Sequence, residues 1–153
     1  MFAAFNRYFE LEGRSTRREF WGFMALNFVV CIVLLIGLVF AIGGQEYDED
    51  ASLFAAILGN GTGLFIFILM LFWVLITFVP NVTVTVRRLH DQGRSGFWYL
   101  GYLVLSWVPL LNIVASLGFL VLMLLPGTRG DNAFGSDPRD SGWGGAAYAT
   151  SAF

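Results

Sequence analysis

The chain has 153 residues, of which 57% are hydrophobic and only 13% charged, with a formal net charge of -2. A charged fraction of about 25% is normal for soluble domains, so this composition excludes an ordinary water-soluble protein, and the negative balance argues against a nucleic-acid-binding protein. The single cysteine, Cys31, excludes an intramolecular disulfide and a zinc site built from several cysteines.

The first predicted element is an interfacial amphipathic segment at residues 1–13, where aromatic and aliphatic residues recur near helical spacing. Gly13 ends it. Thr16 and Glu19 then have the spacing of a capping box that starts the next helix. The apolar run Phe20–Ile42 follows and predicts the first transmembrane helix. A cleaved signal peptide is the competing interpretation, but the run is longer than the roughly 7 to 15 residues of a signal core.

Residues 43–63 predict an exposed acidic loop that joins the first two spans, because this stretch combines four acidic residues with a glycine-rich end. The second span is predicted at Leu64–Val86. Pro80 lies in its last third and predicts a kink, because proline cannot donate its amide and clashes with the carbonyl of Ile76. Nearby threonine hydroxyls could satisfy the backbone groups that the proline frees.

The third apolar run, Phe97–Leu125, would be roughly 43 Å long as one helix, which is too long for a single comfortable crossing. Pro109 and Asn112 interrupt it, so we predict a hairpin of two short helices split near Pro109. A single kinked helix is the alternative. The segment 139–153 is rich in glycine, serine and alanine and predicts a flexible C-terminal tail.

These elements predict an all-α membrane protein: a small bundle of four transmembrane helices, or three in the alternative, preceded by the interfacial helix. Residues 14–138 form the single transmembrane domain. Arginines lie before the first span and after the second, whereas the loop between those spans has no basic residue. The positive-inside rule therefore predicts a multi-pass protein of the bacterial inner membrane with a cytoplasmic N-terminus.

Three blocks of sequence carry a family resemblance: Gly13–Trp21, Arg87–Trp98 and Pro126–Pro138. In order and spacing they resemble the bacterial inner-membrane family of unknown function numbered 805. The chain departs from that family at Arg129, where proline is frequent, and at Ala133, where a basic residue is common. The resemblance implies a multi-span inner-membrane protein and no particular biochemical activity.

In the predicted topology the three blocks meet at the cytoplasmic membrane surface as an arginine-rich cap. One interpretation pairs Arg87 with Asp91 and Glu19 to lock helix ends together. Asp91 would stand at a helix C-terminus, which disfavours a carboxylate, so it needs a cationic partner such as Arg17, Arg88 or Arg94. The other interpretation is an anion or lipid head-group site. The candidate residues for both are Arg14, Arg17, Arg18, Glu19, Arg87, Arg88, His90, Asp91, Arg94 and Asp131.

No catalytic motif is present, so we do not expect an enzyme. His90 is the only imidazole, and a chemical role would pair it with Asp91 or Asp131 and use Ser95 as nucleophile. We expect no cofactor and no metal. The expected partners are membrane lipids, with anionic lipids favoured, and no nucleic acid. The alternative function is a small oligomeric channel or transporter subunit for a small solute, lined by Asn27, Thr77, Asn81 and Asn112.

Overall fold

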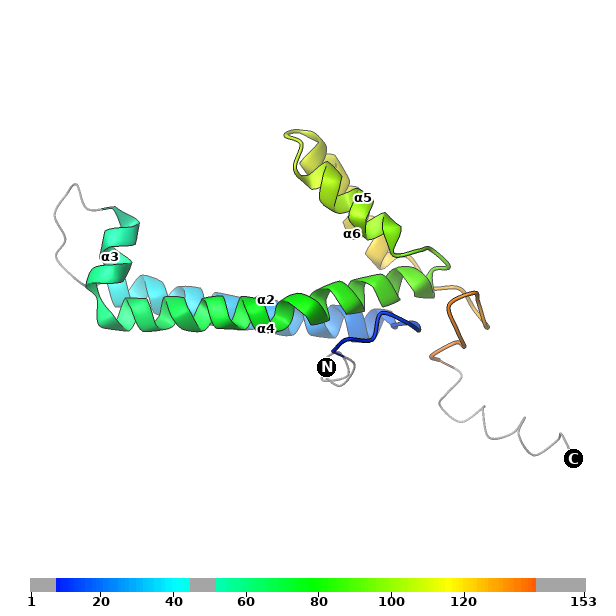
Figure 1. Cartoon of the computed structure of the whole chain (residues 1–153), viewed down its shortest axis with the longest axis horizontal. Helices are drawn as coiled ribbons and strands as arrows, with labels where there is room; N and C mark the ends of the chain where they lie inside the picture. Colours follow the sequence, from blue (N-terminus) through cyan, green and yellow to red (C-terminus); the bar gives the residue numbers. More distant parts are fainter. Residues whose placement is uncertain (1–7, 45–51, 140–153) are drawn as a thin grey trace, which may run out of the picture. The chain divides into compact units, whose positions relative to one another are not determined.

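The computed structural model describes residues 8–44 and 52–139, and the regular secondary structure within these ranges is helical, apart from one isolated antiparallel bridge (Figure 1). The described helices are α2 (Arg17–Gly43), α3 (Leu53–Gly59), α4 (Gly61–Asp91), α5 (Phe97–Ser106) and α6 (Leu111–Leu124). They fall into two compact units. The first unit is Met1–Phe23 with Pro80–Phe153, and the second is Met24–Val79.

The two longest helices have the length and composition of membrane spans. Helix α2 has 27 residues with a mean hydropathy of 3.0, and α4 has 31 residues with a mean hydropathy of 2.6. Only 6% and 11% of their most apolar stretches are buried inside the protein. Large apolar side chains such as Phe28 and Leu75 are exposed by 68% and 72%. Exposure of this much apolar surface to water would cost free energy, whereas exposure to lipid does not. The predicted membrane class is confirmed, and both helices extend beyond the limits of the predicted spans.

The start of α2 follows the predicted capping pattern in part. The Thr16 hydroxyl accepts a hydrogen bond from the Glu19 amide at 3.2 Å, as expected of an N-cap. The Glu19 carboxylate makes an ion pair with Arg87. Of the predicted interfacial segment, residues 1–7 lie outside the described residues, and residues 8–13 form turns and bends without helix.

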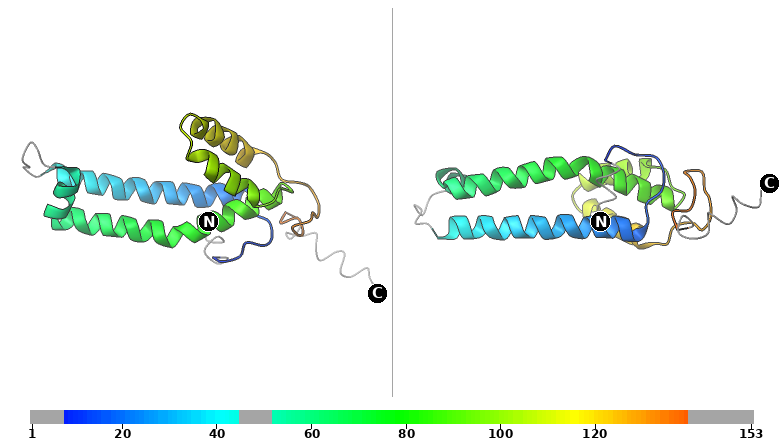
Figure 2. Two further views of the ribbon diagram at one scale, coloured as in Figure 1. Left: turned by 45° about the horizontal axis from the view of Figure 1, so that its top comes forward. Right: turned by 90° about the horizontal axis from the view of Figure 1, so that it is seen from below.

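In the second unit, α2 and α4 run side by side in opposite directions and are joined through α3 (Figures 1 and 2). Asn60 makes the connection: its side-chain amide donates to the Ala41 carbonyl at 2.5 Å, and its oxygen accepts from the Thr62 amide at 3.0 Å. Gly63 allows a close approach, because a β-carbon there would lie 3.3 Å from Ile42. The asparagine thus caps α4 and fixes it to the end of α2.

The prediction that residues 43–63 form a loop throughout is wrong in its second half. Helix α3 occupies Leu53–Gly59, and the Ser52 hydroxyl caps it by accepting from the Ala55 amide at 3.2 Å. The glycines that suggested a loop stand at the boundary between α3 and α4, where Asn60 turns the chain. The acidic residues between Glu46 and Asp50 lie outside the described residues.

Helix α4 continues through Pro80, at the boundary between the two units. The kink itself stays a prediction. The nearby threonines bond to carbonyls of their own helix: the Thr83 hydroxyl donates to Pro80 O at 3.1 Å, and the Thr85 hydroxyl to Asn81 O at 2.6 Å. The Thr77 hydroxyl likewise donates to Trp73 O at 2.8 Å. The hydroxyls of all three threonines therefore donate to carbonyls of α4 itself.

The predicted hairpin in the third apolar run is confirmed as a local structure. Helices α5 and α6 lie side by side and are joined by a turn that contains Pro109 (Figures 1 and 2). The rings of Tyr102 and Phe119 stack between them at 4.3 Å. Helices of 10 and 14 residues are about 15 and 21 Å long, against about 30 Å for the hydrocarbon core. That each of them crosses the membrane stays a prediction.

Candidate functional site

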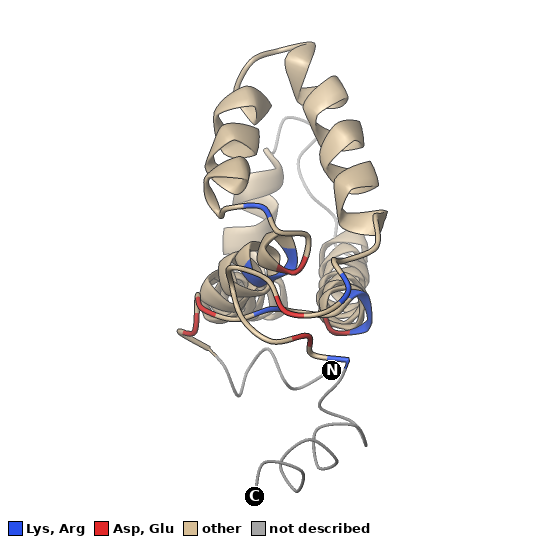
Figure 3. Ribbon diagram, turned by 90° about the vertical axis from the view of Figure 1, so that its right-hand side faces the viewer, with Lys and Arg blue, Asp and Glu red and all other residues tan. Residues whose placement is uncertain are grey.

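The charged residues of the first unit gather in the segments at the base of the α5–α6 hairpin, whereas the hairpin itself carries none (Figure 3). Three of these residues, Arg14, Arg88 and Asp91, form a buried cluster that we call the Asp91 network. They are exposed by 3%, 0% and 2%. Full burial of three ionisable groups is costly unless each is paired and hydrogen-bonded.

Both oxygens of the Asp91 carboxylate are held by arginine. Oδ1 accepts from Arg14 Nε at 3.1 Å and from Arg14 Nη2 at 3.0 Å, and Oδ2 accepts from Arg88 Nη1 at 2.5 Å. Arg88 lies one turn before Asp91 on α4, whereas Arg14 comes from the segment that precedes α2. The two arginines supply the cations that a carboxylate at the end of a helix requires.

The remaining donors of both arginines bond to the segment after α6. Arg14 Nη1 donates to Gly130 O and Arg14 Nη2 to Thr128 O, both at 2.6 Å. Arg88 donates to the carbonyls of Met123 and Leu125. These carbonyls belong to the end of α6 and to the stretch that follows it, which we call the 126–139 loop. The Asp91 network therefore joins three segments that are far apart in the sequence.

The backbone reinforces the same junction. The Asp91 carbonyl accepts from the Thr128 amide at 2.8 Å and from the Thr128 hydroxyl at 3.1 Å. Gly127 lies directly against the carboxylate, because a β-carbon there would stand 1.9 Å from Asp91 Oδ2. Only glycine fits at this position unless the network moves.

Arg87 makes a second, separate ion pair. Its Nη2 lies 3.2 Å from Glu19 Oε1, and its carbonyl accepts from the Ser15 amide at 3.1 Å. The sequence had suggested an Arg87–Asp91 pair, which the structure does not form. Arg88, three residues before Asp91, takes that place, and Arg87 instead joins the end of α4 to the first turn of α2.

His90 is held as a structural side chain. Its ring stacks on Phe134 at 4.2 Å, its Nδ1 lies 3.3 Å from the Gly13 carbonyl, and its own carbonyl accepts from Asn132 Nδ2 at 2.9 Å. Within the described ranges neither Asp91 nor Asp131 hydrogen-bonds to the ring. The pairing of His90 with Asp91 or Asp131 that the sequence suggested is therefore not seen among these residues.

The other predicted site residues lie outside the Asp91 network. Asp131 Oδ1 accepts from the Asp137 amide at 3.2 Å, which is a turn-stabilising contact. The Arg94 guanidinium lies over the Trp98 ring at 4.9 Å. Arg17 is exposed and donates to Leu124 O at 3.3 Å. Arg18 is exposed and has no hydrogen bond or ion pair with the part of the chain that the structure describes.

Four arginines surround a small cavity of about 170 Å³, which we call the arginine pocket. It is lined by Thr16, Arg17, Arg18, Arg88, Asp91, Gly127 and Arg139. The lining has four arginines and one carboxylate, that of Asp91, which is already bonded to Arg14 and Arg88. The pocket therefore carries a surplus of positive charge. Such a surplus favours an anion.

Sequence reasoning placed the Pro126–Pro138 block in the cap and named Asp131 there, but it missed the contacts of Gly127, Asp137 and Arg139. The Asp137 carboxylate accepts from Arg139 Nε at 2.8 Å and from the amides of Gly130 and Arg139 at 3.0 and 3.1 Å. The bond from the Arg139 side chain, with help from these amides, lowers the pKa of Asp137 to about 2. The abundance of glycine, aspartate, asparagine and proline in this stretch was the available signal, since these residues build ordered turns as readily as flexible tails.

The described residues contain no group of three or more His, Cys, Asp or Glu side chains that could hold a metal ion.

The side chains suggested as pore-lining residues include Asn112, whose Nδ2 donates to Ser106 O at 2.8 Å across the hairpin turn. Thr77 donates to a carbonyl of its own helix. Both are thus engaged in local backbone contacts.

Comparison with known proteins identifies relatives over nearly the whole chain. Residues 8–136 match the family described as "Protein of unknown function (DUF805)". The inner membrane protein YhaI of Escherichia coli is 31% identical over 134 residues, which cover 88% of this chain and 90% of the relative. Inner membrane protein YhaH is 28% identical (88% and 91% covered), and the uncharacterized protein YiiR 30% identical (86% and 88%), both from Escherichia coli. No solved structure matches the chain.

Proposed function

We propose that this chain, which belongs to the DUF805 family of proteins of unknown function, is a structural module of the inner membrane whose Asp91 network fastens three membrane-proximal segments. The location follows from the inner-membrane relatives and the two long apolar helices. The proposal concerns what the polar cap does there. Its support is the sharing of one buried carboxylate between arginines that are 77 and 3 residues away in the sequence.

A structural role fits the chemistry of Asp91 better than a catalytic one. A carboxylate that acts as a base needs an accessible oxygen close to its substrate. Asp91 is 2% exposed, its two oxygens accept three hydrogen bonds from arginine, and Gly127 lies against it. Removing one partner of such a group leaves an unpaired charge in a dry environment, which strongly destabilises a fold. The network therefore favours one arrangement of the three segments.

Limited proteolysis in mild detergent tests this role. In the wild-type protein the Asp91 network holds the 126–139 loop, so trypsin should cut slowly after Arg129. In Asp91→Asn the loop loses its attachment, and we expect the same cut to become at least about tenfold faster, the equivalent of ~1.4 kcal/mol in the opening equilibrium. Glu19→Gln is the matched control, because it removes the Arg87–Glu19 ion pair and leaves the loop attached. Equal cutting of all three proteins would contradict the proposal.

A second candidate function is the binding of anionic lipid head groups in the arginine pocket. The supporting observation is the lining of a 170 Å³ cavity by Arg17, Arg18, Arg88 and Arg139 around a single carboxylate. Basic residues near a membrane surface contribute roughly 1 kcal/mol each to the binding of anionic lipid. The pocket offers hydrogen-bond donors that match a phosphate, in a cap that we infer to lie at the membrane surface.

Thermal stabilisation by short-chain lipids tests the second candidate. A short-chain phosphatidylglycerol should raise the unfolding temperature of the wild-type protein more than the matching phosphatidylcholine does. Replacing Arg17 and Arg18 together by glutamine should reduce the apparent affinity for the anionic lipid by about an order of magnitude. Arg129→Gln, a change in an exposed arginine outside the pocket lining, should leave it unchanged. Identical responses to both lipids would remove this candidate.

We also infer a multi-pass topology with the cap on the cytoplasmic side. The arginines of the first unit lie up to the first turn of α2 and from the last turns of α4 onward, and residues 43–63 between these ends contain no basic residue. Under the positive-inside rule this distribution places the N-terminus and residues 92–96 in the cytoplasm.

A further inference from the structure

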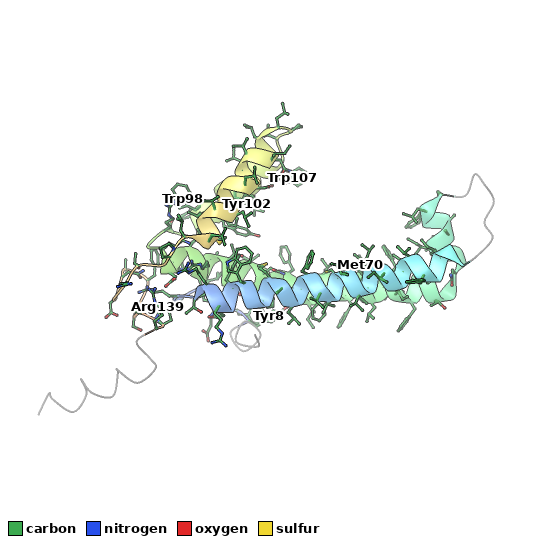
Figure 4. The ribbon with its side chains drawn as sticks, turned by 180° about the vertical axis from the view of Figure 1, so that it is seen from behind. Tyr8, Met70, Trp98, Tyr102, Trp107 and Arg139 are labelled. Carbon is green, nitrogen blue, oxygen red and sulfur yellow. The ribbon has the colours of Figure 1, made fainter. Side chains whose placement is uncertain are left out.

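The α5–α6 hairpin carries a groove that lies outside the Asp91 network and the arginine pocket. Its volume is about 600 Å³, within the range of small-molecule sites, and its walls are almost entirely apolar. The lining comes from residues 94–122 of the first unit alone. Figure 4 shows two of these side chains, Trp98 and Tyr102, along the hairpin.

Two glycines, one on each helix, give the groove its width. Neither Gly101 nor Gly118 would bring a β-carbon within 4 Å of another side chain, so open space lies beside both. The stacked rings of Tyr102 and Phe119, with centroids 4.3 Å apart, hold α5 against α6 and form part of the same lining. The helices are therefore in contact, yet they leave a groove that a flexible hydrocarbon chain can fill.

Arg94 is the only charged residue in the lining. Its guanidinium stacks on Trp98 at 4.9 Å, and the side chain makes no hydrogen bond or ion pair with residues in the described ranges. A cation fixed over an indole ring keeps its planar donors available at the ring edges, which suits a phosphate or carboxylate. Ser95, also in the lining, adds a hydroxyl beside it.

We propose that this α5–α6 groove binds one anionic amphiphile, with an acyl chain along Gly101 and Gly118 and the anionic head group on Arg94. In a membrane an apolar groove gains little hydrophobic energy from a lipid chain, because the surrounding lipid is equally apolar. The chain fills the groove through van der Waals contact, and Arg94 selects the charge of the head group. The proposal rests on the membrane location and is independent of the role of the Asp91 network and of the arginine pocket.

Two chemically related ligands fit this description: an anionic phospholipid and a free fatty acid. Native mass spectrometry of the delipidated full-length protein separates them. Phosphatidylglycerol, phosphatidylcholine and oleate are each titrated onto the wild-type protein. Retention of phosphatidylglycerol in preference to phosphatidylcholine supports a phospholipid site, and preferential retention of oleate supports a fatty acid site. Equal retention of phosphatidylglycerol and phosphatidylcholine, with no retention of oleate, would overturn the proposal.

Three variants locate the bound lipid. Arg94→Gln should weaken binding of the anionic ligand about fivefold, which corresponds to ~1 kcal/mol, without changing that of phosphatidylcholine. Gly118→Leu should fill the groove and abolish retention of every chain. Arg17→Gln with Arg18→Gln removes binding in the arginine pocket, so the phosphatidylglycerol that this variant still retains should weaken further when Arg94→Gln is added, which distinguishes the groove from the arginine pocket. Unchanged retention in Arg94→Gln and Gly118→Leu would contradict the assignment.

Because a leucine in the groove could disturb the hairpin, an experiment on the wild-type protein accompanies the variants. Phosphatidylglycerol with a brominated acyl chain quenches nearby tryptophans, and Trp98 lies in the groove lining. Quenching should therefore be stronger in the wild-type protein than in Trp98→Phe, and excess unbrominated phosphatidylglycerol should reverse it at low lipid ratios. Quenching that is equal in the two proteins would also count against the proposal.

Discussion

Gly127 lies so close to the Asp91 carboxylate that a β-carbon at position 127 would stand 1.9 Å from Oδ2 and 2.4 Å from Cγ. The carboxylate cannot move aside easily, because Arg14 and Arg88 hold both of its oxygens. We therefore predict that Gly127→Ala destabilises the protein by about 1 to 3 kcal/mol, the usual cost of overpacking. Thermal unfolding in detergent measures the loss. Gly43→Ala, at a position with open space, is the control and should be nearly neutral.

A second prediction concerns the charge of Asp91. Asp91→Asn leaves Arg14 and Arg88 buried with an uncompensated charge, so we expect a loss of about 3 to 5 kcal/mol in the free energy of unfolding. Glu19→Gln should cost less, because Glu19 is partly exposed to solvent and, among the described residues, is ion-paired with Arg87 alone.

The double variant of Asp91→Asn with Arg14→Gln tests whether the two residues act together. Because each single change removes the same contact, the double change should cost less than the sum of the single changes. Strict additivity would show that Arg14 and Asp91 do not stabilise each other, whatever their distance in the structure.

The need for a cation near Asp91 could be predicted from the sequence, but its main partner could not. A carboxylate at a helix C-terminus requires compensation, and Arg88 was among the expected residues. Arg14 was missed as its partner because no local spacing rule connects residues 77 positions apart. Helical spacing also favoured Arg87, which in the folded chain meets Glu19 instead.

Apolar runs were predicted well, and polar, glycine-rich stretches were not. The spans and the Pro109 turn follow from hydropathy and proline chemistry, which act locally. By contrast, α3 was missed because its flanking glycines suggested a continuous loop. Ser52, which caps α3, and Asn60, which caps α4, were signals of the helices there. The order of the 126–139 loop depends on contacts with Arg14 and Asp91, which the loop sequence alone does not reveal.

The third prediction concerns acid. The Arg139 side chain holds the pKa of Asp137 at about 2 in the folded protein, below its ordinary value of 3.8. A carboxylate with a lowered folded pKa stabilises the fold fully above its unfolded pKa and loses that contribution as pH falls toward the folded pKa. The stability difference between the wild-type protein and Asp137→Asn should thus be constant above about pH 5 and shrink between about pH 4 and 2. Unfolding temperatures of both proteins across this window test it, and a difference that does not change would contradict it.

The fourth prediction is the orientation of the chain. Because the arginines lie up to the first turn of α2 and from the last turns of α4 onward, with none in residues 19–86, we expect residue 49 in the periplasm and residue 92 in the cytoplasm. A reporter enzyme that is active only in the periplasm should function when fused at Glu49 and fail when fused at Gln92. A reporter on the C-terminus should also fail, because the hairpin returns the chain to the side from which it entered. Periplasmic activity of the Gln92 fusion would reverse the assignment.

The last prediction departs from the four-span expectation, in which α5 and α6 each cross the membrane: we expect the tip of the α5–α6 hairpin to end inside the membrane. Its helices are about 15 and 21 Å long, so they enter a hydrocarbon core of about 30 Å without crossing it. The turn is apolar and projects outward, with Trp107 exposed by 87% and Leu110 by 82%. Several of its polar groups are bonded internally: the Trp107 and Val108 amides donate to carbonyls of α5, and Asn112 donates to the carbonyls of Ser106 and Val108. Internal bonding of this kind is what hydrocarbon demands of a turn.

Cysteine labelling tests the depth of this tip. In a Cys31→Ala background, Leu110→Cys should resist a membrane-impermeant maleimide from both sides of the membrane and react after the protein is denatured. Gln92→Cys is the control and should react from the cytoplasmic side alone. Labelling of position 110 from the periplasm would show that α5 and α6 cross the membrane with the help of tilt or local thinning, which would make four spans. Protection from both sides would leave α2 and α4 as the only full crossings among the described helices, because a tip held in hydrocarbon cannot reach the opposite surface.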